Sequence, residues 1–191
     1  HAIKFQSYKA KNLCTKNAPR FWDWEGEIES DGSQFDSYSH LDSFGEADHA
    51  ELKRMCDYYD IEFMSTPFDL ESFKFLNEIK VSKIKIASFD TVNLKFLREI
   101  SKYNKEFIMS VGMSKLTEIK KAYSILKKNK KNKVSLLHCI SSYPTMEKDA
   151  NLNCIEKLKQ TFNCKVGQSD HTNDIFVPFC AVVMGATIIE K

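Results

Sequence analysis

With 191 residues, of which 42% are hydrophobic, the chain is long enough to bury a core of its own and predicts one soluble globular domain. Its 28 basic and 26 acidic residues nearly balance, and no basic stripe interleaved with aromatic residues is present, which excludes a nucleic-acid surface. The longest apolar run, around residues 176–186, contains Pro178 and is too short to cross a bilayer, so no membrane role is expected.

The six cysteines show no Cys-x-x-Cys spacing, and a chain of this length does not need disulfide bonds to stabilise its core. They stand at positions 14, 56, 139, 154, 164 and 180. We therefore expect reduced thiols and a cytoplasmic protein.

Short runs with β propensity alternate with segments of helical period along the whole chain. The runs predict strands at residues Ala2–Gln6, Ile61–Thr66, Ser82–Ser88, Glu106–Val111, Val134–Cys139, Cys164–Ser169 and Ala186–Glu190. The intervening segments predict helices at residues Ala47–Tyr59, Leu70–Ile79, Val92–Tyr103, Lys115–Asn129, Leu152–Phe162 and Ile175–Met184. The fourth helix is the clearest, because Ser114 can cap it and its apolar residues, Ile119, Ala122, Tyr123 and Leu126, share one face.

This alternation requires a parallel sheet covered by helices, either doubly wound or closed into a barrel. Polar groups end nearly every strand, and no strand is followed by a glycine-rich dinucleotide fingerprint, which favours a (β/α)8 TIM barrel. Such a barrel has eight strands, seven are visible, and the chain begins and ends inside a strand. We therefore expect a single partial TIM-barrel domain over residues 1–191, comprising strands 2 to 8.

Two segments depart from the rhythm of strands and helices. Lys9–Gly45 shows little periodicity and predicts a long loop, in which Trp22 and Trp24 cover either a subunit contact or the substrate. The lysine-rich run Lys120–Lys133 predicts a solvated helix end and turn rather than an anion site.

Lysines stand inside two of the apolar strands. Side chains alternate along a strand, so Lys4 and Gln6 share one face, directed into a barrel interior, and Lys83 and Lys85 behave in the same way. Burying an ammonium group costs several kcal/mol unless an anion or a carboxylate meets it. Lys4 and Lys85 therefore predict either a bound anion or an internal ion pair.

Hydroxyl groups gather at the predicted strand ends, where they can donate hydrogen bonds to phosphate oxygens, as can amides near Gly112. They belong to Ser65, Thr66, Ser88, Ser110, Ser141 and Ser169. Each one alone is as readily a helix cap or turn residue, but their common position favours a shared site.

His171 follows a strand end between Asp170 and Thr172, where it can bind a divalent metal, act as a base or cap the next helix. Metal binding needs a further ligand. His138 is the one plausible histidine partner in the sequence, and its strand position leaves open which way it points.

Seven motifs in chain order resemble those of the sialic acid synthase family. They are Ala2–Gln6, Phe63–Asp69, Ile84–Ser88, Ile108–Met113, Leu137–Pro144, Gly167–Thr172 and Gly185–Lys191. The resemblance implies a TIM-barrel enzyme that condenses phosphoenolpyruvate with an N-acetylated hexosamine, such as N-acetylmannosamine, to give sialic acid or a related nonulosonic acid and phosphate. It also implies a divalent metal, typically Mn²⁺ with Mg²⁺ or Co²⁺ as alternatives, and a homodimer of the full-length protein.

The resemblance also assigns roles by motif position. The phosphoenolpyruvate contacts of the family fall on Lys4, Thr66, Lys85, Ser88, Ser110, Ser141 and Ser169, its sugar contacts on Asp90 and Tyr143, and its first metal histidine on His171. Gln6 is a further candidate for substrate binding on the same face as Lys4. Lys85 and His171 are the expected catalytic residues, because they bring a cation and a metal ligand to the two reactants.

Some features of the family are missing from this chain. Its first strand, with a Glu-Ile-Gly motif, would precede His1, its second metal histidine would follow Lys191, and its antifreeze-like carboxyl domain is absent. Position 90 is aspartate where some members have glutamate, and position 141 is serine where some have asparagine, which leaves the exact sugar open.

Two other functions are compatible with the sequence. A pyruvate aldolase would use Lys85 as a Schiff-base nucleophile, since that chemistry requires a desolvated lysine. Alternatively, the chain is an inactive barrel fragment or a binding module that retains the strand and helix pattern.

Overall fold

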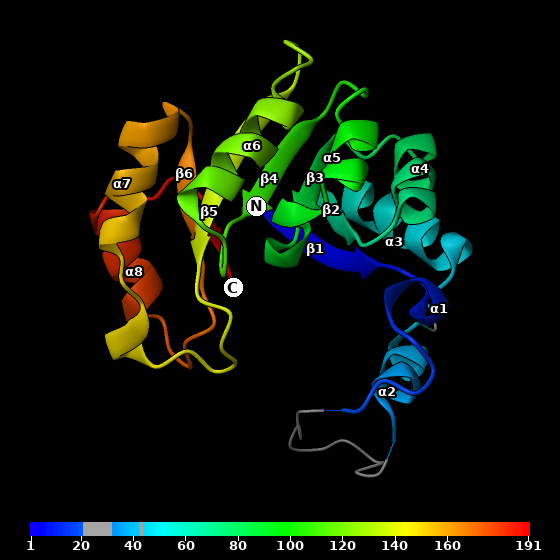
Figure 1. The fold of residues 1–191 in the computed structure, drawn as a ribbon. Helices are drawn as coiled ribbons and strands as arrows, with labels where there is room; N and C mark the ends of the chain where they lie inside the picture. Colours follow the sequence, from blue (N-terminus) through cyan, green and yellow to red (C-terminus); the bar gives the residue numbers. More distant parts are fainter. Residues whose placement is uncertain (21–31, 43) are drawn as a thin grey trace. The chain divides into compact units, whose positions relative to one another are not determined.

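The computed structural model describes residues 1–20, 32–42 and 44–191. The chain forms two compact units, His1–Val81 and Ser82–Lys191 (Figure 1). In both, parallel strands alternate with helices, which confirms the predicted α/β class.

The first unit is built around two parallel strands. Strand β1 (Ala2–Ser7) pairs with β2 (Glu62–Pro67), so that Phe5 stacks on Phe63 with ring centroids 5.3 Å apart. Its helices are α1 (Ala10–Leu13), α2 (Gln34–Leu41), α3 (Glu46–Tyr58) and α4 (Leu70–Glu78). Helices α3 and α4 pack on β2 and cover its apolar side chains.

The prediction of one long loop over Lys9–Gly45 was wrong, because α1 and α2 lie within this segment. Helix α2 begins at a capping box, in which Ser33 Oγ accepts from the Asp36 N–H at 3.2 Å and the Asp36 carboxylate accepts from the Ser33 N–H at 2.9 Å. A capping box fixes a helix start without any apolar period. Trp22 and Trp24 lie outside the described residues, so their covering role stays a prediction.

The second unit contains five strands that pair in parallel and in chain order, namely β3 (Lys83–Ile86), β4 (Glu106–Ser110), β5 (Lys133–Cys139), β6 (Val166–Ser169) and β7 (Ile189–Glu190). Its helices are η1 (Ser88–Val92), α5 (Leu94–Ile100), α6 (Leu116–Leu126), η2 (Glu147–Asp149), α7 (Asn153–Phe162) and α8 (Phe176–Val183). Helix α7 packs on β5 and β6, and α8 packs on β6 (Figure 1). The strands are accordingly apolar on the side that the helices cover.

Every predicted strand and helix is present among the described residues, with ends shifted by a few positions. Ser88 opens the short helix η1 instead of ending β3, and β7 is only two residues long. The parallel α/β arrangement is thereby confirmed, while a closed eight-stranded barrel in the complete protein stays a prediction.

Helix α6 shows one correct and one wrong local prediction. Ile119, Ala122 and Leu126 are buried as its predicted apolar face requires. Ser114 does not cap it, because its hydroxyl donates to Gly112 O at 3.3 Å, while the Glu118 carboxylate accepts the Lys115 N–H at 2.7 Å.

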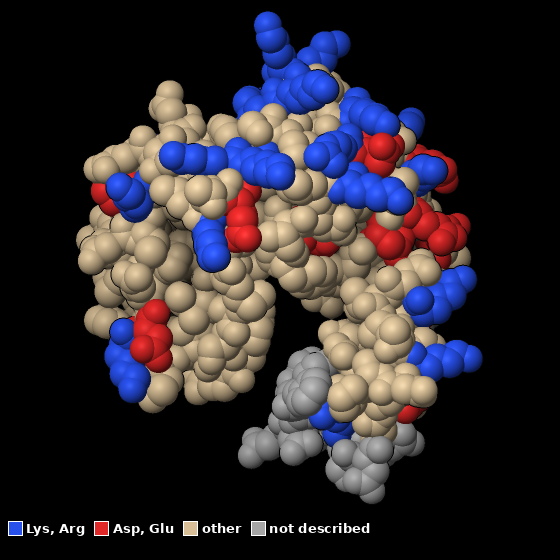
Figure 2. Space-filling view, viewed as in Figure 1, with Lys and Arg blue, Asp and Glu red and all other residues tan. Residues whose placement is uncertain are grey.

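The turn after α6 agrees with its predicted exposure to solvent. Figure 2 shows lysines over the turn between α6 and β5, and Lys127, Lys128, Lys130, Lys131 and Lys133 are all exposed, as a solvated turn requires. All six cysteines lie within the described residues and none of them forms a disulfide. The helices of the described ranges are too short or too polar to traverse a bilayer.

Candidate functional site

Lys85, near the carboxyl end of β3, is only 5% exposed. Its Nζ lies 3.3 Å from Glu190 Oε2 at the end of β7 and donates to Ile86 O at 3.2 Å. An internal ion pair, one of the two partners expected for this lysine, is therefore present. Glu190 was given no role from the sequence, although an acid that ends a strand of the same sheet is a natural counter-charge.

Cys139 is the centre of a polar cluster at the ends of β5 and β6. It is buried and hydrogen-bonds with the side chains of His171, Ser88 and Ser169. Burial raises the pKa of the Cys139 thiol, but these three hydrogen bonds and the charge of His171 together outweigh it and leave the pKa below its ordinary value. The cluster therefore brings together three predicted site residues around a cysteine that the sequence analysis treated only as a reduced thiol.

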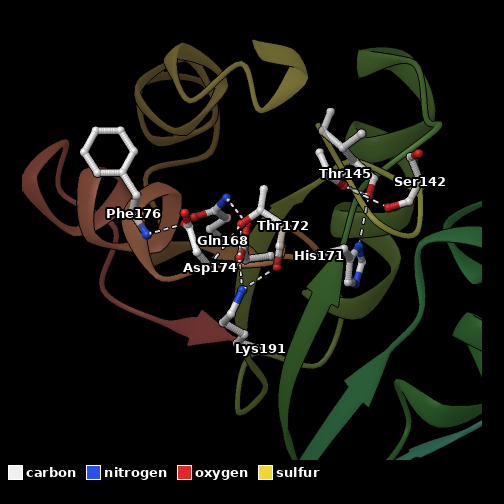
Figure 3. A network of polar contacts seen from close by, with 10 residues as sticks. Ser142, Thr145, Gln168, His171, Thr172, Asp174, Phe176 and Lys191 are labelled. Carbon is white, nitrogen blue, oxygen red and sulfur yellow. Dashed lines mark hydrogen bonds and ion pairs between the residues drawn. The ribbon is translucent and has the colours of Figure 1, made fainter. Parts of the chain in front are cut away.

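His171 is held in a defined orientation by a hydrogen bond of its ring (Figure 3). Its Nδ1 lies 3.0 Å from Ile140 O, which can only accept, so Nδ1 carries the proton and Nε2 carries the lone pair of the neutral ring. The ring lies against Tyr143, with centroids 4.1 Å apart. The hydrogen bond with Cys139 raises the pKa of His171, and burial opposes this effect.

His138 is not a partner of His171 in the described structure. Its Nε2 lies 2.7 Å from Ala150 O, and its neighbour Cys139 faces the cluster. Because successive residues of a strand point to opposite faces, His138 points away from the cluster.

Gly112, after β4, lies close to two predicted residues, Ser88 and Ser141. Its N–H donates to Ser88 Oγ at 3.0 Å, and a Cβ at this position would lie 2.8 Å from both Cys139 O and Ser141 Oγ. No side chain fits there without displacing its neighbours, so a glycine is required for the loops after β3, β4 and β5 to meet.

Asp90 and Ser110 are buried polar residues with unused hydrogen-bonding capacity. Asp90 is 2% exposed, and its Oδ1 accepts from Asn93 Nδ2 at 3.1 Å. Asp90 Oδ2 and Ser110 Oγ are buried and find no partner among the described residues. Burial raises the pKa of Asp90 to about 6, although the hydrogen bond from Asn93 opposes the shift.

Lys4, Gln6 and Thr66 belong to the first unit. Gln6 and Thr66 are neighbours in the register of β1 and β2, Thr66 is buried, Lys4 is half-buried and Gln6 is exposed. Their predicted role beside residues of the second unit stays a prediction.

A metal centre needs several His, Cys, Asp or Glu side chains close together. Across residues 1–20, 32–42 and 44–191, no three His, Cys, Asp or Glu side chains gather closely enough to hold a metal ion. Within these ranges His171 contributes an oriented imidazole to the polar cluster, without a ligand set around it.

The fold and the site define a parallel α/β protein with hydroxyl groups, a buried lysine and an imidazole at its strand ends. The NeuB family model matches residues 1–191, and the chain belongs to this family. Homologues in the family are named as synthases of sialic, legionaminic and pseudaminic acids, so the predicted family is confirmed.

Among the relatives, an N,N'-diacetyllegionaminic acid synthase from Campylobacter jejuni is 40% identical over 99% of this chain and 57% of its own length. A synthase of the same name from Legionella pneumophila is 36% identical over all of this chain and 54% of its own length. The solved structure of a sialic acid synthetase from Leptospira borgpetersenii, in complex with citrate, has a TM-score of 0.85 at 37% identity and covers 100% of this chain and 61% of its own. The chain thus spans little more than half of the proteins that it matches.

Proposed function

We propose that the complete protein condenses phosphoenolpyruvate with an N-acetylated hexosamine, N-acetylmannosamine or a relative, to give sialic acid or a related nonulosonic acid and phosphate. Family membership and the names of the relatives support a nonulosonic acid synthase. The observation that carries the proposal is the buried Lys85 at the same sheet end as Ser88, Ser169 and His171.

In this proposal the phosphoenolpyruvate anion is bound by cationic and hydroxyl groups. Lys85 supplies positive charge. Before substrate binds, the ion pair with Glu190 compensates this buried charge. Hydroxyl donors come from Ser88, Ser110, Ser141 and Ser169. Lys4, Gln6 and Thr66, which belong to the first unit, are proposed to bind substrate as well. When several hydrogen-bond donors already point to one place that is shielded from water, they orient phosphoenolpyruvate without having to rearrange themselves.

The acceptor sugar is proposed to lie near Asp90 and Tyr143. Asp90 keeps one carboxyl oxygen without a partner among the described residues, so it can exchange a hydrogen bond with a sugar hydroxyl or amide. Aspartate is shorter than the glutamate of some family members, so this position bears on which N-acetylated hexosamine is accepted.

We further propose that a divalent ion, Mn²⁺ before Mg²⁺ or Co²⁺, binds to the complete protein with His171 Nε2 as one ligand. The hydrogen bond from Nδ1 to Ile140 O supports this proposal, because ligating histidines characteristically donate their other N–H to a carbonyl or carboxylate. Among the described residues no group of three candidate ligands gathers around His171. A cytoplasmic homodimer is the proposed form of the complete protein.

The test is phosphate release from phosphoenolpyruvate by the complete protein, measured with a panel of N-acetylated hexosamines. We expect release only when an acceptor sugar is present, and we expect chelation, His171→Ala and Lys85→Met each to abolish it. Lys102→Met is the control, because Lys102 forms an exposed ion pair with Glu99 in the same unit. Release without an acceptor, or activity indifferent to chelation and to His171→Ala, would contradict the proposal.

A pyruvate aldolase remains the second candidate, because Lys85 is buried enough to act as a Schiff-base nucleophile. Borohydride reduction in the presence of pyruvate separates the two. A covalent adduct on Lys85 would favour the aldolase, whereas no adduct together with sugar-dependent phosphate release would favour the synthase.

A further inference from the structure

The carboxylate of Asp170, which precedes His171, accepts hydrogen bonds from three side chains of its own protein, those of Lys191, Thr172 and Gln168. Oδ2 accepts from Lys191 Nζ at 2.6 Å and from Thr172 Oγ1 at 2.8 Å, while Oδ1 accepts from Gln168 Nε2 at 3.2 Å. The side chain is only 1% exposed. A carboxylate held by three donors and shielded from water is poorly placed to bind a ligand or remove a proton, so its contacts indicate an anchoring role.

Lys191 holds the turn on both sides of His171. Besides the ion pair with Asp170, its Nζ donates to Thr172 O at 2.7 Å. The main chain adds a third connection, since the Asp170 N–H donates to Glu190 O at 2.8 Å. The end of β7 is therefore tied to the residue before His171 and to the residue after it.

The other side of His171 is tied to the loop after β5. Its ring donates to Ile140 O, and its carbonyl oxygen accepts from the Thr145 N–H at 2.8 Å. Thr145 is itself fixed, because its hydroxyl donates to Ser142 O at 2.9 Å. The imidazole thus lies between two anchored segments, and its orientation depends on both.

We propose that Lys191 and Asp170 are positioning residues for His171. Their ion pair, in which the carboxylate is buried and the lysine is partly exposed, fixes the turn Asp170–Thr172, so that the ring donates its Nδ1 proton to Ile140 O and Nε2 keeps the lone pair. Removing Lys191 leaves a buried carboxylate with its neutral donors alone, and such an uncompensated charge is costly enough for the turn to rearrange and solvate it. The part of this inference that concerns turnover rests on the proposed function, whereas the orientation of the ring does not.

The first test measures the ring directly. In the complete protein labelled with ¹⁵N-histidine, the His171 signals are assigned by their loss in His171→Gln and compared among wild type, Lys191→Met and Lys191→Arg at one pH. We expect the Nδ1-protonated tautomer in wild type and Lys191→Arg, and shifted or exchange-broadened signals in Lys191→Met. Unchanged signals in Lys191→Met would overturn the inference.

The second test separates a positioning role from a merely structural one. We expect Lys191→Met to lower kcat about tenfold or more, with KM for phosphoenolpyruvate nearly unchanged, and Lys191→Arg to restore most of the loss. The control is Lys102→Met, since its Nζ also lies 2.6 Å from a carboxylate but on an exposed surface. A loss confined to KM, or wild-type kcat in Lys191→Met, would contradict the role.

Two precautions keep these outcomes interpretable. If Lys191→Met does not fold, Lys191→Gln replaces it, because the amide retains a donor for Asp170 without the charge, and the same shift of the His171 signals is expected. If the wild-type protein has no synthase activity, the proposed function fails on its own, and the histidine signals still decide whether Lys191 orients His171.

Discussion

At the scale of single residues, burial governs the chemistry of the side chains at the strand ends. Lys85 is buried against Glu190, so its charge is compensated, while Asp90 is buried beside a neutral amide and its pKa rises to about 6. The pKa of Cys139 is instead lowered, because its hydrogen bonds and the charge of His171 outweigh the effect of burial. Residues of similar exposure thus acquire different protonation behaviour from their neighbours.

The raised pKa of Asp90 predicts a pH-dependent stability. Between its ordinary value of 3.8 and about 6, the folded protein holds a proton that the unfolded chain releases, so stability falls as the pH rises through this window. Asp90→Asn has no carboxyl group to ionise at this position, so its unfolding free energy does not fall in this window. We expect its unfolding free energy to exceed that of wild type by on the order of 3 kcal/mol above pH 6 and to equal it near pH 3.

Denaturant unfolding across this pH range measures the difference. Asp149→Asn is the matched control, because Asp149 is exposed in the same unit and should show no such divergence. A constant difference between Asp90→Asn and wild type from pH 3 to pH 7 would show that Asp90 is not the group responsible.

At the scale of elements, apolar period locates the helices and polar side chains decide where they start and how they connect. The period of Ile119, Ala122 and Leu126 was sufficient to find α6, but its true cap is Glu118 and not Ser114. Several hydroxyl and carboxylate groups near a helix start can each accept from its free amides, and only the three-dimensional arrangement shows which of them does so.

The turn between α6 and β5 depends on one buried amide. Asn132 is 1% exposed; its Nδ2 donates to Ser101 O at 2.9 Å and Leu126 O at 3.0 Å, and its Oδ1 accepts the Lys105 N–H at 3.1 Å. Asn132→Ala removes all three of these hydrogen bonds to the main chain. We expect an unfolding free energy lower by on the order of 3 kcal/mol, measured by chemical denaturation.

The exposed Asn153 at the start of α7 provides the comparison for this variant. Asn153→Ala should change the unfolding free energy by less than about 0.5 kcal/mol. Equal small effects of the two substitutions would mean that the Asn132 hydrogen bonds contribute nothing to the turn.

At the scale of the whole molecule, the chain forms two compact units, each with candidate residues of its own, and spans 54–61% of the three proteins compared with it. The second unit brings Lys85, Ser88, Ser169 and His171 to the strand ends. The first unit contains Lys4, Gln6 and Thr66. An enzyme that uses all of these residues needs both units in a defined arrangement.

We expect residues 1–191 alone to release no measurable phosphate from phosphoenolpyruvate in the presence of N-acetylmannosamine. The physical reason is that the described residues offer no group of three metal ligands around His171 or elsewhere. The measurement is phosphate release by this chain beside the complete protein, with circular dichroism as the control for folding. Robust turnover by residues 1–191 would show that the site is complete within them.

The sequence by itself determined the α/β class, the order of strands and helices, the family and most of the candidate residues, because apolar period and strand-end motifs are local properties of the chain. Tertiary structure alone decided that Lys85 pairs with Glu190, that His138 faces away from His171 and that Cys139 lies at the centre of the polar cluster. It also showed that Lys191 holds Asp170. These contacts join residues 21 to 105 positions apart, and no local pattern reports which strand ends meet across a sheet or which way each side chain points.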